Sequence, residues 1–285
     1  MQRVTNLQYW MDPYLIANLE TLLYNIKDDW DFVLIITGDG MVRVGKSELA
    51  QQLGYYVAWR LKTPFSVDNV CFTGEELKEK AHKFPMNSVL IYDEARGELD
   101  NKKLLQKITK NLLDFFAECG LYNHLILIVL PDYFELPKGI AINRSDALIN
   151  VVRTRKEKQL TNGKTVVEYT RGTFQFFDRR RKKKLYIDGK KNYDNYDAVK
   201  PAFFGEFRKF CPIDQDAYKA KKRSYVKRTP DSKPEDNKFA VALTALCSVV
   251  TQREAAKVLT EKGLHISQGR INQIINKYRR EKPRI

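Results

Sequence analysis

The sequence has few cysteines and histidines, four and three in 285 residues, and it has no long apolar run. No apolar run reaches the roughly 18 residues that a bilayer-spanning helix requires, and the first ten residues lack the pattern of a secretory signal. No CxxC pair and no Cys/His spacing suited to zinc occurs among the four widely separated cysteines, Cys71, Cys119, Cys211 and Cys247. These absences argue against a disulfide-bonded secreted domain, a zinc module and an integral membrane protein. We therefore expect a reduced protein of the cytoplasm, the host cytoplasm if the source is viral.

Negative charge is scarce in only part of the chain. The 285 residues include 50 Lys+Arg and 35 Asp+Glu, for a net charge of +15. Residues 1–150 hold 16 basic and 20 acidic side chains (−4), residues 151–230 hold 23 and 9 (+14), and residues 231–285 hold 11 and 6 (+5). A mildly acidic first half followed by a strongly basic remainder predicts a polyanionic partner, with nucleic acid first. The alternative is a basic surface that is merely solvated.

Short apolar runs alternate with helical patterns through the first 150 residues. We expect strands at 32–37, 69–72, 88–92, 125–130 and 147–152, and helices at 46–62, 75–84 and 103–119. Thr73 and Glu76 have the spacing of a capping box at the start of the second helix. Strands that alternate with helices predict a three-layer α/β domain with a mostly parallel sheet.

The residue pattern changes after residue 153, and such changes in pattern divide the chain into four parts. Short, aromatic-rich segments at 165–170, 173–178 and 184–187 predict antiparallel strands, with turns at Asn162-Gly163 and Asp188-Gly189. Residues 218–237 have almost no large aliphatic side chain and predict a linker. We expect an α/β core (1–155), a basic β-rich appendage that continues the sheet (156–217), the linker (218–237) and a small helical domain (238–285).

A glycine-rich segment between the first strand and its helix carries the strongest motif. Gly40 to Ser47 fits GxxxxGK[ST] in full, in the strand–loop–helix context that the motif requires. Backbone N–H groups of such a loop point at phosphates, the lysine neutralises the β- and γ-phosphates, and the serine hydroxyl is a Mg²⁺ ligand. The predicted ATP site comprises Gly40, Met41, Val42, Arg43, Val44, Gly45, Lys46, Ser47 and Glu48.

Two adjacent carboxylates follow a second apolar strand. Asp93 and Glu94 come directly after residues 88–92, in the position of the second half of such a site. We expect Asp93 to join Ser47 in holding Mg²⁺ and Glu94 to polarise the attacking water as a general base. The alternative is that the pair begins a solvated loop or helix.

These motifs resemble the P-loop ATPases that use a catalytic glutamate, the group of RecA-like, AAA+ and FtsK/HerA-type motors. The match covers residues 32 to about 153. Within it, residues 130–138 and 142–147 are similar to zonular occludens toxin-like ATPases of phages and mobile elements. The resemblance implies a homo-oligomer, usually a hexameric ring, that moves or remodels DNA. Phosphoryl transfer also needs positive charge on the transferring group, commonly an arginine from a neighbouring subunit; Arg144, Arg153 and Arg155 are candidates, although each could equally be a surface arginine.

The sequence departs from that family at the end of the fourth strand. Such motors usually carry a polar sensor there, whereas Leu130 and Pro131 occupy the place in this chain. Asp132 and Asn123 are the candidates to replace it.

Two segments are candidates for contact with DNA, which we expect to be double-stranded. The first is a run of six cations: Arg179, Arg180, Arg181, Lys182, Lys183 and Lys184. Its alternative is a solvated hairpin tip or a lysine-rich solubilising loop. The second is a helical pattern at 239–250, 251–262 and 267–280 that resembles a helix-turn-helix, with Ala255, Val258, Leu259, Ile271, Ile274 and Ile275 facing inward. The polar groups of its last helix suit phosphates and base edges: Ser267, Gln268, Arg270, Asn272, Gln273 and Asn276. A protein-binding helical bundle is the alternative.

Two functions remain open from the sequence. The first is an ATP-hydrolysing DNA motor or remodeller of a virus, phage or mobile element, serving packaging, transposition, replication or segregation. The second is an ATP-switched transcription regulator or assembly scaffold with slow turnover. A small-molecule kinase would share the P-loop, but it explains neither the basic middle block nor the C-terminal helices.

Overall fold

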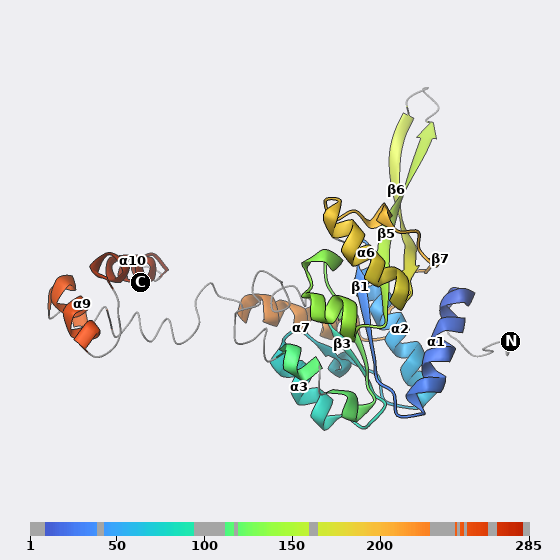
Figure 1. Cartoon of the computed structure of the whole chain (residues 1–285), viewed down its shortest axis with the longest axis horizontal. Helices are drawn as coiled ribbons and strands as arrows, with labels where there is room; N and C mark the ends of the chain where they lie inside the picture. Colours follow the sequence, from blue (N-terminus) through green and yellow to red (C-terminus); the bar gives the residue numbers. More distant parts are fainter. Residues whose placement is uncertain are drawn as a thin grey trace. The chain divides into compact units, whose positions relative to one another are not determined.

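The computed structural model describes residues 9–38, 43–93, 112–116, 119–159, 165–228, 243, 246–247, 250–261 and 267–281. The chain forms two compact units, Met1–Ala220 and Lys221–Ile285 (Figure 1). Within the described part of the chain, no helix is both long enough and apolar enough to cross a membrane. Each unit is described in turn.

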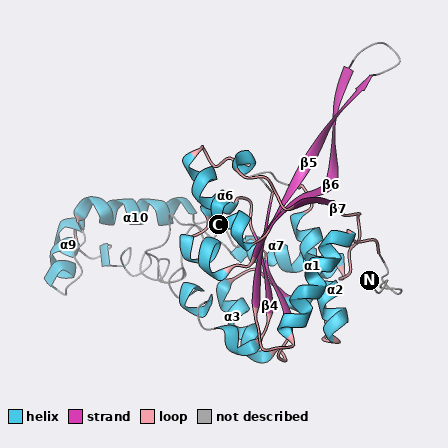
Figure 2. Ribbon diagram, turned by 45° about the vertical axis from the view of Figure 1, so that its right-hand side comes forward, coloured by secondary structure: helices cyan, strands magenta, loops and turns pink. Residues whose placement is uncertain are grey.

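A seven-stranded sheet with the order β2-β3-β4-β1-β5-β6-β7 forms the centre of the first unit. Its first five strands are parallel: β2 (Val70–Cys71), β3 (Val89–Tyr92), β4 (Leu125–Val129), β1 (Phe32–Thr37) and β5 (Ala147–Gln159). β6 (Thr165–Phe177) and β7 (Phe203–Glu206) continue the sheet as antiparallel strands. Strands β1, β3 and β4 are almost completely buried because helices cover both faces (Figure 2). The predicted α/β class and mostly parallel sheet are confirmed.

Helices pack on the two faces of this sheet. One face carries α2 (Lys46–Leu61), with α1 (Pro13–Ile26) beside it. The opposite face buries Val33, Ile35 and Ile128 against α3 (Gly74–Lys83) and α6 (Arg179–Lys191) in one apolar cluster. Thr73 caps α3 as predicted, since its side chain accepts a hydrogen bond from the backbone of Glu76. Of the helix expected at 103–119, residues 112–116 are helical and the remainder lies mostly outside the described residues.

Strands β5 and β6 form a hairpin longer than the strands beside them. Its ladder runs from the pair Leu148–Phe177 to the pair Gln159–Thr165, and its far half extends beyond the sheet (Figure 1). The register shifts between Val152 and Thr154, opposite Gly172, whose φ of +102° favours glycine. The turn expected at Asn162-Gly163 lies outside the described residues.

Two elements of the basic block differ from the prediction. Residues 184–187 were expected as a strand followed by a turn at Asp188-Gly189, but both belong to α6, which begins at the N-cap Asp178. The first half of the expected linker is also a helix, α7 (Gln215–Arg228). Asp214 initiates α7 by accepting hydrogen bonds from the backbones of Asp216 and Ala217.

Within the described residues, the second unit contains the helices α9 (Gln252–Glu261) and α10 (Gln268–Glu281). Of the helix expected at 239–250, residues 243, 246 and 247 are helical and most of the remainder lies outside the described residues. The core of this unit is formed by four buried apolar side chains, with six others packed partly around them. The buried four are Leu243, Ala255, Ile271 and Ile275. Leu259 and Ile274 pack against this core as expected, but Val258 is 44% exposed, so its predicted inward position is wrong.

Candidate functional site

The described half of the glycine-rich loop turns sharply before α2 begins. Arg43 and Gly45 both have positive φ, +59° and +108°, and Gly45 is the N-cap of α2. Gly45 has no room for a side chain, because a Cβ there would lie 2.9 Å from the ring of Phe207. Of the predicted site residues, Gly40, Met41 and Val42 lie outside the described residues. The described turn directs the amino end of α2 toward the carboxyl edge of the sheet.

The side chain of Lys46 folds back over the end of β1. A Cβ on Gly38 would lie 2.9 Å from Lys46 Nζ, so the ammonium group lies against the backbone of that glycine. Gly38 donates its N–H to the carbonyl of Pro131, which ties the loop to the end of β4. The lysine charge is therefore held at the carboxyl edge, beside the amino end of α2, where a phosphate group would also be attracted to the helix.

Ser47 and Asp93 meet across the sheet. Ser47 Oγ donates a hydrogen bond of 3.2 Å to Asp93 Oδ1, although β4 lies between the strands that precede the two residues. Asp93 is 2% exposed, and its N–H donates to the carbonyl of Cys71. A hydroxyl beside a buried carboxylate is an all-oxygen donor set that fits Mg²⁺. Glu94 lies outside the described residues.

A segment near the end of the first unit, residues 207–218, lies against the amino end of α2, and we call it the strap. Glu48 Oε1 accepts a 2.8 Å hydrogen bond from the backbone of Phe210, and Gln52 donates to the carbonyls of Arg208 and Phe210 at 2.7 and 3.0 Å. The carboxylate of Glu48, predicted to be part of the ATP site, thus holds the strap. No local pattern in the sequence identifies the strap, because these contacts with α2 join residues more than 150 positions apart.

The strap also reaches the acidic half of the site. Tyr218, on the first turn of α7, donates a 2.5 Å hydrogen bond to Asp93 Oδ2 and is itself 8% exposed. Its ring lies 5.9 Å from that of Phe72, between centroids. The two carboxylate oxygens of Asp93 therefore have different partners, Ser47 and Tyr218.

A buried polar chain crosses the carboxyl ends of β4, β1 and β5. Tyr196 donates to Asp132 Oδ1 at 2.9 Å, accepts from the backbone of Tyr133 at 2.7 Å and lies 3.5 Å from Thr37 Oγ1. Thr37 in turn lies 3.4 Å from Asn150 Oδ1. Burial raises the pKa of Tyr196 well above its usual value, which keeps the hydroxyl protonated as a donor.

The two candidates for the missing sensor lie at opposite edges of the sheet. Asp132 lies at the carboxyl end of β4, on the same edge as the loop before α2. Asn123 precedes β4 and donates to Asp29 Oδ1 at the amino edge, so the structure contradicts Asn123 as a sensor.

The candidate arginines lie at opposite edges of the sheet. Arg144 precedes β5 at the amino edge, where it donates to the carboxylate of Asp31 and the carbonyl of Phe116. Arg153 is on the hairpin beyond the carboxyl edge, with its guanidinium 5.0 Å from the ring centre of Tyr169. Arg155 on the same strand pairs with Glu157. Arg144 is therefore engaged within its own chain, and Arg153 is the candidate on the edge of the sheet where α2 begins.

The six consecutive cations divide between the surface and the interior. Lys182 is fully buried, and its ammonium group donates to the carbonyls of Ala141 and Ile142 at 2.7 and 3.1 Å. The expectation that Lys182 contacts DNA is therefore wrong. The other five are exposed: Arg179, Arg180, Arg181, Lys183 and Lys184.

Two of those exposed arginines have partners in the protein. Arg179 pairs with Asp146 and Arg181 with Asp178. Arg180, Lys183 and Lys184 lie on the outer face of α6 together with Lys191.

The polar side chains of α10 face outward. Asn272 and Asn276 are exposed and joined by a 3.0 Å hydrogen bond, and the side chain of Arg270 is outside the described part. The remaining predicted DNA-contact residues of this segment are also exposed: Ser267, Gln268 and Gln273.

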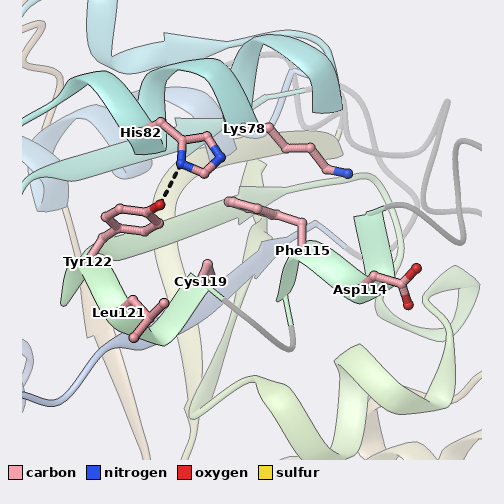
Figure 3. A pocket seen from close by; sticks show the side chains of 7 residues that line it. All are labelled: Lys78, His82, Asp114, Phe115, Cys119, Leu121 and Tyr122. Carbon is pink, nitrogen blue, oxygen red and sulfur yellow. Dashed lines mark hydrogen bonds between the residues drawn. The ribbon is translucent and has the colours of Figure 1, made fainter.

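A separate pocket of about 270 Å³ lies between α3 and the helical turn Cys119–Tyr122 (Figure 3). His82 and Tyr122 face each other across it, with His82 Nδ1 2.5 Å from the tyrosine hydroxyl. None of the predicted site residues lines it, because Tyr122 precedes β4 and so lies toward the amino edge. Its lining is Lys78, His82, Asp114, Phe115, Cys119, Leu121 and Tyr122.

The chain matches no protein-family model and no curated protein. Among solved structures it is similar to the genome packaging NTPase B204 from Sulfolobus turreted icosahedral virus 2. The structure of its complex with ATP-gammaS has 15% sequence identity to this chain and a TM-score of 0.33. The structure of its complex with AMPPCP has 14% sequence identity and a TM-score of 0.34. B204, the DNA-packaging ATPase from Sulfolobus turreted icosahedral virus, has 16% sequence identity to this chain and a TM-score of 0.33. Each alignment covers 53% of this chain and 93% of the other, and the likeness is one of fold.

Proposed function

We propose that this chain binds ATP with Mg²⁺ at the carboxyl edge of the sheet and hydrolyses it to move or remodel DNA. The observation that carries the proposal is the 3.2 Å hydrogen bond between Ser47 and Asp93. It brings together the two motifs that were expected to form one site, from segments 46 residues apart. The placement of Lys46 at the same edge supports it.

Each residue has a distinct role in this proposal. Lys46 neutralises charge on the β- and γ-phosphates, while backbone groups before α2 orient them. Ser47 and Asp93 would hold Mg²⁺, which would offset the negative charge that develops on the phosphates. Glu94 accepts the proton of the attacking water, and Asp132, through Tyr196, is our candidate sensor. Arg153 is the candidate to reach a neighbouring subunit.

DNA is the proposed substrate because of where the exposed cations lie. The outer face of α6 carries Arg180, Lys183 and Lys184, and the hairpin adds Arg153 and Arg155. A rigid helix that presents several cations suits a phosphate backbone. The pair α9 and α10 is proposed as a helix-turn-helix that reads sequence.

ATP binding and turnover by two variants test the proposal. Lys46→Ala should abolish ATP binding, because the phosphate charge is no longer neutralised, whereas Lys62→Ala, a lysine just past the other end of α2, should bind as the wild type. Glu94→Gln should retain binding and lower turnover by about 10² to 10⁴, the usual contribution of a general base. Unaltered hydrolysis in Glu94→Gln would remove Glu94 from the mechanism.

Addition of duplex DNA distinguishes the motor from a switch. A motor should show ATP hydrolysis that DNA stimulates clearly. Tight ATP binding with negligible turnover, with or without DNA, would favour the ATP-switched regulator instead.

A further inference from the structure

Both carboxylate oxygens of Asp93 accept hydrogen bonds, one from Ser47 of the glycine-rich motif and one from Tyr218, which belongs to no motif. Oδ1 accepts from Ser47 at 3.2 Å, and Oδ2 accepts from Tyr218 at 2.5 Å. Both Asp93 and Tyr218 are buried, at 2% and 8% exposure. The tyrosine comes from α7, 125 residues further along the chain.

We infer that Tyr218 is a positioning residue for the Mg²⁺ site, and this inference rests on the proposed function. The carboxylate of an aspartate turns readily about its last side-chain bond, because that torsion has a broad energy profile. A phenol that donates to Oδ2 fixes this rotation and keeps Oδ1 toward Ser47. Groups that orient a metal-binding carboxylate in this way are usually worth about 10- to 100-fold in metal affinity or activity.

The strap gives the tyrosine hydroxyl a fixed place. Glu48 and Gln52 of α2 hold the backbone around Phe210, and Gln51 Oε1 accepts from Gln215 at 3.0 Å. Asp214 then initiates α7 directly before Tyr218. Because α2 carries both Ser47 and these anchors, the same helix fixes the serine and, through the strap, the partner of the carboxylate.

The test compares ATP affinity with and without Mg²⁺ in the full chain. Binding of a fluorescent, slowly hydrolysed ATP analogue is measured in excess Mg²⁺ and in EDTA, so that the readout does not depend on catalysis. Tyr218→Phe keeps the ring next to Phe72 and removes only the hydroxyl. We expect the gain in affinity on adding Mg²⁺ to fall by about tenfold, with the affinity in EDTA unchanged.

Tyr186→Phe is the matched control. Tyr186 is also buried, and its hydroxyl donates a 2.7 Å hydrogen bond to the carbonyl of Leu136 instead of to Asp93. The control should retain the wild-type Mg²⁺ gain. Thermal unfolding of both variants shows whether loss of a buried hydrogen bond alone accounts for the effect.

Each outcome has one meaning. A Mg²⁺ gain in Tyr218→Phe equal to that of the wild type, or larger, overturns the inference and leaves the proposed function intact. Equal losses in Mg²⁺ and in EDTA also overturn it, because they indicate a purely structural role. If the wild-type chain does not bind the analogue at all, the proposed function itself fails.

Discussion

Lys182 shows how a single residue can differ from the run in which it lies. Five of the six cations from Arg179 to Lys184 reach solvent, and Lys182 is buried among backbone carbonyls. A signal for this was present, since Lys182, Leu185, Tyr186 and Gly189 have the i, i+3, i+4, i+7 spacing of a buried helical face. Six like charges in succession obscured that spacing.

The burial of Lys182 makes the stability of the fold depend on pH. Burial lowers the pKa of Lys182 from 10.5 to about 8. Between these values the unfolded chain binds more protons than the folded one, so this residue's contribution to the free energy of unfolding rises with pH from about 8 to about 10.5. The full change is on the order of 3 kcal/mol.

Lys182→Met should remove this dependence. Urea unfolding of the variant and of the wild type is measured at several pH values from 7.5 to 10. The free energy of unfolding of the wild type should rise with pH relative to that of the variant. Lys184→Met, an exposed neighbour on the same helix, should follow the wild type. Parallel pH profiles for wild type and Lys182→Met would contradict the account.

Single residues of the site were predictable to different degrees. Lys46, Ser47 and Asp93 belong to motifs whose spacing is imposed by the loop and the strand end, and the structure brings Ser47 and Asp93 together. Tyr218 and Tyr196 belong to no motif. Their hydroxyls reach the site only through the fold of the chain, over 125 residues in one case and 64 in the other, so local spacing does not reveal them.

At the scale of the element, the buried strands were the predictable part. Continuous apolar runs such as Phe32–Thr37 and Leu125–Val129 suit a sheet covered on both faces, and the structure has them as β1 and β4. Helices α6 and α7 were missed because charge, rather than an apolar stripe, dominates their sequences. Their N-caps, Asp178 and Asp214, were the available signals.

The register shift in the long hairpin lies opposite one glycine, Gly172. Gly172 has φ +102°, and a Cβ there would lie 2.5 Å from the carbonyl oxygen of Phe207 at the start of the strap. Gly172→Ala should therefore lower the free energy of unfolding by about 1–3 kcal/mol. Gly139→Ala, where no atom lies within 4 Å of the added methyl group, is the control and should change stability little. Equal stability of both variants in denaturant titrations would contradict this role.

The exposed face of α6 gives a prediction for DNA binding. Replacing Arg180, Lys183 and Lys184 by Gln should reduce the slope of log K against log salt concentration by about 2 to 3, since each lost phosphate contact removes about 0.9. The same exchange at Lys27, Lys62 and Lys83 alters the net charge equally at other exposed positions and should leave the slope nearly unchanged. Equal slopes for both triple variants would indicate that the basic run of α6 is a solvated surface that does not contact DNA.

At the scale of the whole molecule, the chain joins an α/β unit to a small helical one. The boundary near Ala220 falls within α7, so the first part of the expected linker, up to residue 228, is helical. Removal of residues 231–285 keeps α7 and the strap. If α9 and α10 read sequence, this truncation should reduce the preference for specific DNA more than ATP turnover. Competition binding with specific and random duplexes, beside an ATPase assay, measures both, and an unchanged DNA preference would refute the reader role.

The central claim is that Ser47 and Asp93 hold the metal of an ATP complex at the amino end of α2. A structure determined with Mg²⁺ and a non-hydrolysable ATP analogue tests it most directly. The account predicts triphosphate density beside residues 45–47 and metal density between the serine hydroxyl and the aspartate. Triphosphate density elsewhere, for example in the pocket beside His82 and Tyr122, with none at α2, would contradict it.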